Sequence, residues 1–410
     1  MKKIYLLTLL IGLTTTIRAQ RFEDHFEERT LRLDYTFCGD ANSQQIYVDQ
    51  LSQMPGWYGK HTRLAEVPLK GNGQLIARDA ATGDTLYRHP FSTLFQEWLA
   101  TDEAKHTPKS FENVFLMPFP KHPMTVTIEL RDYHERVNAS ITHRVDPSDI
   151  LIRRIGERDV TPYIVLQQAK DTTHCIHITF IAEGYQESEM DSYLAHCRES
   201  LDALFHHEPF QSLKDRFHIT ALLTPSVDSG VSEPGNGIWR NTALGSHFDT
   251  FYMQRYLTTL HLKRMHDLLA GTPYEHIIVL ANTEHYGGGG IYNSYNLSYT
   301  RGKHFRPVVV HEFGHSFGGL GDEYPYGDND PMYFADTEPW EPNLTTKKDF
   351  SGKWQNLIDA GISGMVEGGG YLSKGVFRGH NDCRMRTNEE PEFCPVCRQA
   401  LTRLIDFYTK

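Results

Sequence analysis

The stretch that decides the fold and chemistry of this chain reads Arg306-Pro-Val-Val-Val-His-Glu-Phe-Gly-His-Ser-Phe-Gly-Gly-Leu-Gly-Asp-Glu-Tyr324. Pro307 suits the first turn of a helix, because the backbone N–H that proline lacks has no helical partner there. The pattern predicts a helix that continues from Val308 to Phe317. Gly318-Gly319 can end it, since glycine readily adopts the left-handed conformation that closes many helices.

Within this predicted helix, His311 and His315 are four residues apart, so their side chains project from one face. Two imidazoles in this arrangement can bind one Zn²⁺, which accepts neutral ring nitrogens in a tetrahedral site. Glu312 lies beside them, where its carboxylate can take a proton from a zinc-bound water that attacks a peptide carbonyl. The sequence therefore predicts one catalytic zinc ion with Glu312 as the general base. The alternative is a buried helix whose histidines only hydrogen-bond to neighbours.

A catalytic zinc ion usually has three protein ligands and one open position. The glycines after the helix can turn the chain so that Asp322 reaches the metal as the third ligand. Glu323 is the nearest competitor, and His380 is a more distant option. If Asp322 binds the metal, Glu323 is expected to orient one of the histidines.

Strands and helices alternate in the region before this motif. Strands are expected over residues 175–182, 217–223 and 276–281, and helices over residues 188–206 and 248–269. Strand, helix, strand, helix, strand implies a largely parallel sheet flanked by helices.

The chain from about Glu23 to Asp146 has a different pattern, with short alternating runs separated by turn residues. Strand pairs are expected at residues 74–78 with 85–87 and at residues 125–130 with 137–145, and a helical stretch near residues 91–104. This spacing fits a β-sandwich. The predicted fold class is therefore α+β or α/β, with a mixed sheet and flanking helices after an N-terminal β-sandwich.

The first twenty residues, MKKIYLLTLLIGLTTTIRAQ, have the layout of a secretory signal peptide. Two lysines precede an apolar run, and Ala19 stands at a plausible cleavage site before Gln20. The predicted organisation is a signal peptide over residues 1–19, an accessory β-sandwich domain over 20–150 and a catalytic domain over 151–410. The alternative for residues 1–19 is a buried N-terminal helix.

The predicted location after cleavage of the signal is periplasmic, cell-surface associated or extracellular. The formal net charge is −11, and removal of Lys2, Lys3 and Arg18 with the signal lowers it by three, to −14. Such an acidic chain has no electrostatic reason to bind nucleic acid or anionic lipid. No other stretch is apolar enough to predict a membrane span.

Six cysteines remain in the exported chain, and three of them lie close together near its end: Cys383, Cys394 and Cys397. Cys394-Pro-Val-Cys397 has the spacing of a redox pair or of half a zinc knuckle, but no second CxxC completes a knuckle. Because the compartment is expected to be oxidising, the sequence predicts a structural disulfide between two of these three residues. The spacing alone leaves the pairing open.

At these residues the chain resembles the metzincin branch of zinc peptidases, whose motif is HExxHxxGxx(H/D) followed by a turn that contains methionine. His311, Glu312, His315 and Gly318 match it in register, whereas position 321 is glycine and the acidic residue follows at Asp322. Within this branch the chain looks most like the IgA peptidase family known as M64. That resemblance rests on the block His311–Tyr324 and on further stretches, namely Phe180–Tyr185, Tyr286–Gly290 and Cys383–Arg386 near Cys394–Cys397.

The resemblance implies that His311 and His315 are zinc ligands, that Glu312 is the base, and that Met385 is the methionine of the turn beneath the metal. Met385 also suits plain core packing, and both roles can hold together. The run Gly287–Gly290 is expected to belong to an edge strand that pairs with an extended peptide, or else to a flexible surface loop.

The leading hypothesis is a secreted zinc metalloendopeptidase that acts on a protein or peptide. The alternative is a zinc-containing binding or adhesion protein with little or no turnover. Zinc-dependent hydrolysis of another bond ranks below both. The family name does not identify the substrate, because specificity depends on loops that vary independently of the metal ligands. The oligomeric state is not predicted.

Overall fold

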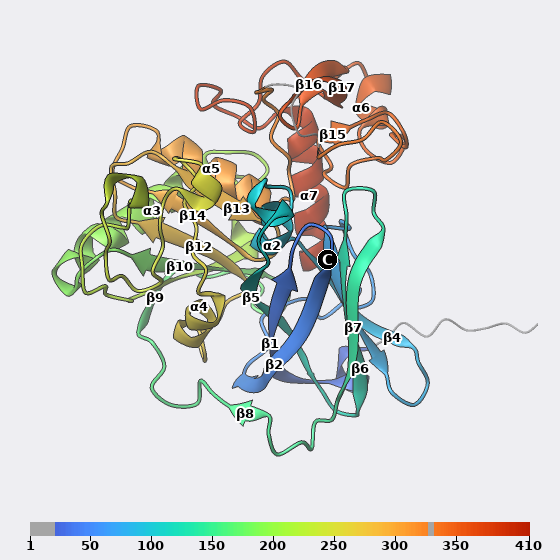
Figure 1. The fold of residues 1–410 in the computed structure, drawn as a ribbon, viewed down its shortest axis with the longest axis vertical. Coiled ribbons are helices and arrows are strands. Elements are labelled where there is room, and N and C mark those ends of the chain that lie inside the picture. The colour runs from blue at the N-terminus through green and yellow to red at the C-terminus, as the bar shows by residue number, and fades with distance from the viewer. Residues whose placement is uncertain (1–20, 327–331) are drawn as a thin grey trace, which may run out of the picture.

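The computed structural model describes residues 21–326 and 332–410, so the predicted signal peptide lies outside the described residues. The protein is a mixed α+β molecule with four sheets and short helices in the described ranges (Figure 1). Among the described residues, no helix is long and apolar enough to cross a membrane.

The N-terminal part of the chain forms two four-stranded sheets, ordered β5-β1-β2-β8 and β4-β3-β6-β7. Its strands are β1 (Phe26–Gly39), β2 (Gln44–Pro55), β3 (Gly73–Asp79), β4 (Thr85–Phe91), β5 (Lys109–Pro120), β6 (Met124–Arg131), β7 (Val137–Val145) and β8 (Arg153–Arg154). Its helices are α1 (Phe22–His25), α2 (Leu94–Trp98) and the 3₁₀ turn η1 (Glu103–Lys105). The predicted strand pairs are confirmed as β3 with β4 and β6 with β7, both antiparallel.

These two sheets share one hydrophobic core. Alternate residues of β1, from Leu31 to Phe37, point into it, as do alternate residues of β6, from Met124 to Leu130. This is the period-two pattern of strands with one buried face. The opposite face of β1 carries Arg32, which is 2% exposed and pairs with Asp34 on its own strand and with Asp267 of the second part of the chain.

The second part of the chain contains a six-stranded sheet of order β13-β14-β12-β10-β11-β9. Its strands are β9 (Tyr163–Gln167), β10 (Ile176–Glu183), β11 (Phe217–Leu222), β12 (His276–Ala281), β13 (Gly288–Ile291) and β14 (Tyr295–Tyr299). The four central strands are parallel, and β9 and β13 are antiparallel strands at the two edges. The sheet is therefore mixed, and its predicted central strands are confirmed.

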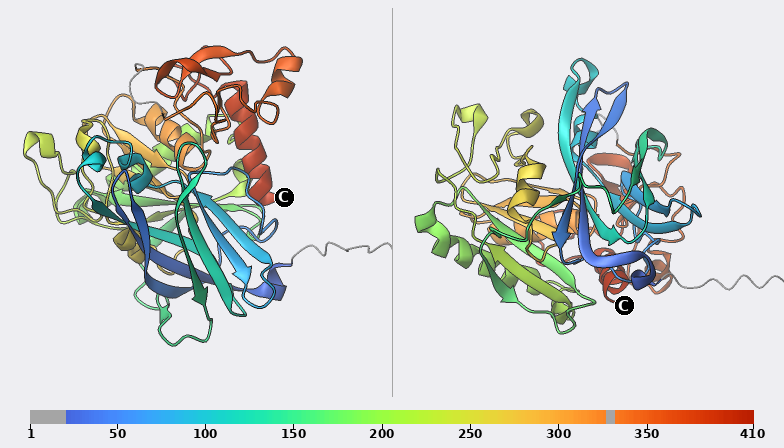
Figure 2. Two further views of the ribbon diagram at one scale, coloured as in Figure 1. Left: turned by 45° about the vertical axis from the view of Figure 1, so that its right-hand side comes forward. Right: turned by 90° about the horizontal axis from the view of Figure 1, so that it is seen from below.

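This sheet is buried on both faces, which explains the continuous apolar runs of its strands. On one face, Ile178 and Ile278 join a core with α3 (Met190–Phe205), α5 (Phe305–Ser316) and α7 (Pro395–Thr409). On the other face, Ile181 and Val279 join the core of the N-terminal sheets. Figure 2 shows the N-terminal strands, in blue to teal, packed along the green-to-orange part of the chain.

The predicted long helix over residues 248–269 is wrong. The segment holds only the 3₁₀ turn η5 (Thr250–Tyr252) and α4 (Leu262–Leu268). Asp249, Phe251 and Tyr252 have φ angles of 59°, 55° and 64°, which no right-handed helix contains. The segment instead forms β-bridges, including one between Tyr256 and Gly288, so tertiary pairing overrides the local helical pattern.

The C-terminal part carries a small sheet, ordered β15-β17-β16, near the upper end of α7 in Figure 1. Its elements are β15 (Leu344–Thr345), α6 (Gln355–Asp359), β16 (Val366–Gly369) and β17 (Leu372–Arg378). Between β17 and α7 runs the loop that contains Cys383 and Met385. This loop passes beneath α5 and completes the site described next.

Candidate metal centre

Helix α5 carries the HExxH motif and lies against β13 and β14 at one edge of the six-stranded sheet. It begins two residues before Pro307 and ends at Ser316, one residue before the predicted end. Gly319 has a φ of +57°, and a Cβ atom there would lie 2.8 Å from the Trp340 ring. The left-handed turn and the close packing both require glycine at this position.

The chain reverses after α5 and brings Asp322 back to the two histidines. The Nε2 atoms of His311 and His315 are 3.0 Å apart. Oδ1 of Asp322 lies 3.1 Å from the first nitrogen and 3.2 Å from the second. Within the described residues Oδ1 of Asp322 has no hydrogen-bond partner, although it faces both nitrogens, so the three ligand atoms converge on one point.

The polar atoms of these side chains that point away from the common point form hydrogen bonds with neighbouring residues. Nδ1 of His311 donates to the backbone carbonyl of Arg384 at 3.1 Å, and Nδ1 of His315 donates to that of Leu320 at 2.6 Å. Both bonds place the ring proton on Nδ1 and leave Nε2 free to accept a metal. The hydroxyl of Tyr371 donates to Oδ2 of Asp322. Each of the three side chains is thus oriented toward the common point.

The electrostatics of the group suit a cation. Burial lowers the pKa of His315, but the Asp322 and Glu312 carboxylates outweigh it and raise the pKa to about 9. Burial raises the pKa of Asp322, but His315 and His311 overcome it and hold the pKa well below its usual range. A positive charge at this point is therefore strongly favoured, and a divalent cation can replace the proton on His315.

Glu312 lies on the sheet side of the histidines, half-buried. A Cβ atom on Gly288 would lie 2.6 Å from Oε1 of Glu312, and one on Gly290 would lie 2.5 Å from its carbonyl oxygen. Burial raises the pKa of the Glu312 carboxyl, while His311 and His315 lower it. The glycines therefore allow α5 to pack directly on β13 and fix the position of this carboxylate.

Three glycines of the run Gly287–Gly290 belong to β13, which begins at Gly288, so the run is not a flexible surface loop. As predicted, β13 is an edge strand. Its outer side is already in use at Gly288, whose N–H donates to the carbonyl of Arg255 and whose carbonyl accepts from Leu257, both at 3.3 Å. At this position the backbone groups on the outer side of β13 therefore pair with the segment before α4, as they would with another strand.

Met385 lies beneath α5 and is fully buried. A Cβ atom on Gly314 would lie 2.6 Å from its sulfur, so the methionine packs directly against the helix between the two histidines. The backbone around Met385 also supports the site. The carbonyl of Arg384 orients His311, and the backbone carbonyl of Met385 accepts from the Glu323 N–H at 2.9 Å.

Two expectations about the neighbouring acidic and thiol groups are wrong. Glu323 does not orient a histidine, because its Oε1 accepts from Asn343 at 3.0 Å and from Cys397 at 3.2 Å. The predicted disulfide is not formed either, since all six cysteines are free. Glu323 contacts Asn343 and Cys397 and not the histidines, and Sγ of Cys383 lies 3.7 Å from Sγ of Cys397, too far for a disulfide bond. His380 is not part of the histidine–aspartate group.

Sequence reasoning missed two residues near this site. Tyr371 comes from the turn between β16 and β17, and no local pattern signals its contact with Asp322. Glu97 comes from α2 in the N-terminal part, and its carboxylate accepts from the Tyr256 hydroxyl. Burial raises the pKa of Glu97 to about 7, and the Tyr256 hydrogen bond and His315 lower it.

Comparisons with known protein families agree with this arrangement. The family model described as IgA Peptidase M64 matches residues 164–365, and that described as Peptidase M64 N-terminus matches residues 21–142. A comparison with curated proteins finds no match. The first match contains the whole of α5 and Asp322. A peptidase hydrolyses peptide bonds in proteins or peptides, so the family match identifies the protein as a hydrolase with such a substrate. The chain belongs to the IgA peptidase M64 family.

Proposed function

We propose that the protein is an exported zinc metalloendopeptidase, with one catalytic zinc ion held by His311, His315 and Asp322 and with Glu312 as general base. The observation that carries the proposal is the convergence of three ligand atoms at 3.0, 3.1 and 3.2 Å from one another. Tetrahedral zinc, with bonds of about 2.0–2.1 Å to nitrogen and oxygen, places its ligands about 3.3 Å apart. The group therefore fits this ion with little movement.

The donor set also points to a catalytic rather than a structural ion. Two imidazoles and one carboxylate leave a fourth position open, as in catalytic zinc sites. The side chains of His311 and His315 are 14% and 16% exposed, so the site is not fully closed to solvent. When bound, zinc supplies Lewis acidity and lowers the pKa of a coordinated water toward about 7. Glu312 then takes the water proton and transfers it to the leaving amine.

The fold supports the same proposal. The HExxH helix beside an antiparallel edge strand, with Met385 beneath it, supports a metzincin-like catalytic domain over residues 151–410. Two sheets with a shared core support a β-sandwich accessory domain over residues 20–150. Glu97 of that domain interacts electrostatically with His315 and Asp322, so the two parts are proposed to act as one unit.

Export is proposed from the N-terminal sequence. The lysines, the apolar run and Ala19 have the order that signal peptidases recognise. We propose that the mature chain begins at Gln20 and works in the periplasm, at the cell surface or outside the cell. Edman sequencing or intact mass of the secreted protein tests this directly, and a retained N-terminus contradicts it.

The function is tested with the mature chain and its Glu312→Gln variant, compared for metal content and for cleavage of an unbiased peptide library. Glu312→Gln keeps the shape of the side chain but cannot accept the proton, so zinc is expected in both proteins and cleavage only in the unmutated one. Glu284→Gln is the control, because Glu284 is exposed and forms a surface ion pair with Arg301. It is expected to leave both properties unchanged.

The possible outcomes separate the candidate functions. Cleavage that survives in Glu312→Gln contradicts the proposed base. Zinc at this site in both proteins with no cleavage by either favours the alternative of a zinc-containing binding or adhesion protein. If the zinc content of the His311→Ala variant equals that of the unmutated chain, the proposed metal centre is contradicted.

A further inference from the structure

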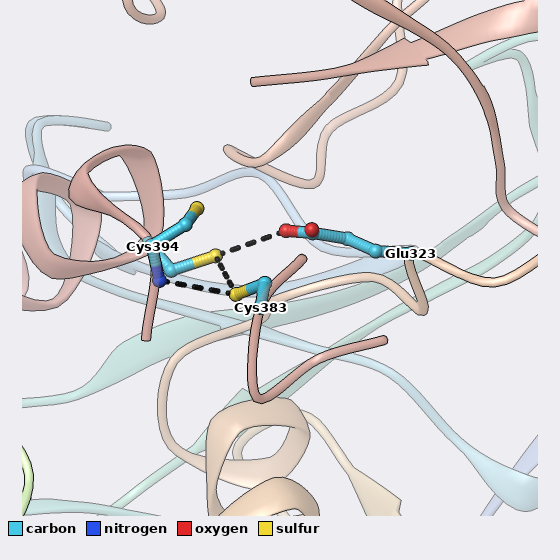
Figure 3. A group of neighbouring side chains, drawn as sticks. Glu323, Cys383 and Cys394 are labelled. Atoms are coloured by element: carbon cyan, nitrogen blue, oxygen red, sulfur yellow. Dashed lines mark hydrogen bonds between the residues drawn. The ribbon is translucent and has the colours of Figure 1, made fainter. Parts of the chain in front are cut away.

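A second group of metal-binding side chains lies on the other side of the Met385 loop. Glu323, Cys383, Cys394 and Cys397 each offer one ligand atom, and these four atoms lie within 4.8 Å of one another. In Figure 3 the carboxylate of Glu323 points toward the sulfur atoms, which come from the loop after β17 and from the start of α7. The group is separate from the histidine–aspartate site and shares no residue with it.

The spacing of these atoms is wrong for a disulfide and right for a metal. Sγ of Cys383 lies 3.7 Å from Sγ of Cys397, whereas a disulfide bond is about 2.05 Å long. Zinc–sulfur bonds of about 2.3 Å in a tetrahedral site place two sulfurs about 3.8 Å apart. Oε1 of Glu323 lies 3.2 Å from Sγ of Cys397, close to the corresponding sulfur–oxygen separation of about 3.5 Å.

The environment of Glu323 provides an independent reason for a cation. Its side chain is 0% exposed, and its Oε2 has no hydrogen-bond partner in the part of the chain that the structure describes. Oε1 has only the Asn343 amide and the Cys397 thiol. Buried carboxylates are normally paired or coordinate metals, because an unpaired buried charge is costly. No Lys or Arg side chain forms an ion pair with Glu323 among the described residues.

Two of the cysteines lie at the N-terminus of α7. Cys394 is the residue before α7, and Cys397 lies in the first turn of that helix. The helix N-terminus carries partial positive charge, which favours a thiolate over a thiol. The backbone N–H of Cys394 also donates to Sγ of Cys383 at 3.2 Å. The three sulfur atoms are buried, so they are shielded from exchange with solvent.

We propose that Glu323, Cys383, Cys394 and Cys397 hold a second Zn²⁺ ion with a structural role. Three thiolates and a carboxylate form a sulfur-rich, four-coordinate set that selects zinc over calcium or magnesium. All four positions are filled by protein, so no place remains for a reacting water. The CxxC at the start of α7 supplies two ligands, and Cys383 and Glu323 take the place of the missing second CxxC.

The second ion would stabilise the histidine–aspartate site, because two of its ligands are adjacent or close in sequence to residues of that site. Cys383 is followed by Arg384, whose carbonyl orients His311, and by Met385, which packs beneath α5. Glu323 follows Asp322, the proposed third ligand of the catalytic ion. A metal that joins Cys383 to Glu323 therefore fixes both segments that close the catalytic site from below.

The test is the zinc content of the full mature chain, measured by inductively coupled plasma mass spectrometry after dialysis against a weak chelator. Two zinc ions per chain are expected. Cys397→Ser and Glu323→Gln should each lower the content to one or below, whereas the control Cys197→Ser should leave it at two, because Cys197 is buried in α3 far from this group along the chain. His315→Ala should remove the other ion only.

Cobalt substitution of the unmutated chain keeps the proposal testable where a variant fails to fold. Cobalt bound to thiolates gives an intense sulfur-to-metal charge-transfer band in the near ultraviolet, which imidazole and carboxylate ligands do not give. The band is expected in the unmutated chain and in His315→Ala, and is expected to be lost in Cys397→Ser. Because His315→Ala disables only the catalytic site, failure of the proposed function and failure of this site are distinguishable.

Either of two results overturns the proposal. One is a single zinc ion per chain with no charge-transfer band, together with free thiols that react with an alkylating reagent after unfolding. The other is a disulfide among Cys383, Cys394 and Cys397, detected in the freshly purified protein by mass spectrometry without reduction.

Discussion

Asp322 and Glu323 are neighbours in the chain, yet their carboxylates belong to different groups of ligands. Oδ1 of Asp322 lies 3.1 Å from Nε2 of His311, whereas Oε1 of Glu323 lies 3.2 Å from Sγ of Cys397. In an extended backbone, successive side chains point to opposite sides. The dipeptide Asp322-Glu323 thereby connects the histidine site with the buried cysteine site, and the Met385 loop lies between the two sites.

The first prediction concerns the third ligand of the catalytic ion. Asp322→Ala should weaken zinc at the histidine site by more than the roughly 10–100-fold typical for loss of an outer partner, because a direct ligand is removed. Peptide hydrolysis should fall to background. Chelator competition measures the affinity. His380→Ala is the control and should keep normal affinity, since His380 is outside the group. Normal zinc binding in Asp322→Ala contradicts this assignment.

A second prediction concerns the hydrogen bond that orients Asp322. Tyr371→Phe removes the hydroxyl that donates to Oδ2 of Asp322 and leaves the ring in place. Zinc affinity or activity should fall by about 10–100-fold, as is typical for outer partners of metal ligands. Tyr326→Phe is a matched control, because its ring stacks on Tyr371 while its hydroxyl contacts Arg255. Equal effects of the two variants contradict a specific role for Tyr371.

The sequence predicts the parts of the site that depend on local geometry. A spacing of four residues in a helix places His311 and His315 on one face, and a glycine pair ends that helix, so α5 and its turn could be expected. Asp322 could be expected because it follows the turn directly.

What could not be predicted depends on contacts between distant segments. Tyr371 and Glu97 come from other parts of the chain, and no periodicity signals their position. The helix expected over residues 248–269 failed because the segment pairs with Gly288. The prediction of a disulfide was wrong because the spacing of the cysteines indicates that they lie close together, but it does not indicate that Glu323 lies among them.

A third prediction concerns the packing of α5 on β13. Gly288→Ala places a Cβ atom 2.6 Å from Oε1 of Glu312, so the proposed base must move. Hydrolysis should fall by at least about 10-fold while the zinc content stays normal, because displacement of a catalytic group by about 1 Å can cost 100-fold in rate. Gly352→Ala is the control, since a Cβ atom there meets nothing within 4 Å. Normal activity in Gly288→Ala shows that Glu312 is not held by this contact.

A fourth prediction separates packing from chemistry at Met385. Met385→Leu keeps the volume and should lower the free energy of unfolding by less than about 1.5 kcal/mol, whereas Met385→Ala should lower it by about 2–5 kcal/mol because it leaves a cavity beneath α5. Activity should follow stability in both variants if the sulfur only packs. Urea unfolding and hydrolysis at low temperature provide the comparison. A large loss of activity in Met385→Leu without loss of stability contradicts a purely structural role.

The fifth prediction concerns acid stability and rests on buried His276. Burial, together with the neighbouring His89 and His177, lowers the pKa of His276 to about 3. The unfolded chain binds this proton below pH of about 6.5, whereas the folded protein binds it only near pH 3, so the proton favours unfolding throughout the window between these values. At pH 5.5 the contribution of His276 alone is a loss of about 1.4 kcal/mol in the free energy of unfolding.

His276→Gln removes the titrating group, so the decrease in unfolding free energy between pH 7.5 and 5.5 should be smaller by about 1.4 kcal/mol than in the unmutated chain. Urea unfolding at both pH values, at one fixed zinc concentration, measures this difference, and contributions common to both proteins cancel. His106→Gln, at an exposed position, is the control and should retain the larger decrease. Because His276 packs edge-on against Phe317 just beyond α5, an equal decrease in all three proteins would mean that water reaches this ring and that the end of the HExxH helix is less tightly closed than its packing indicates.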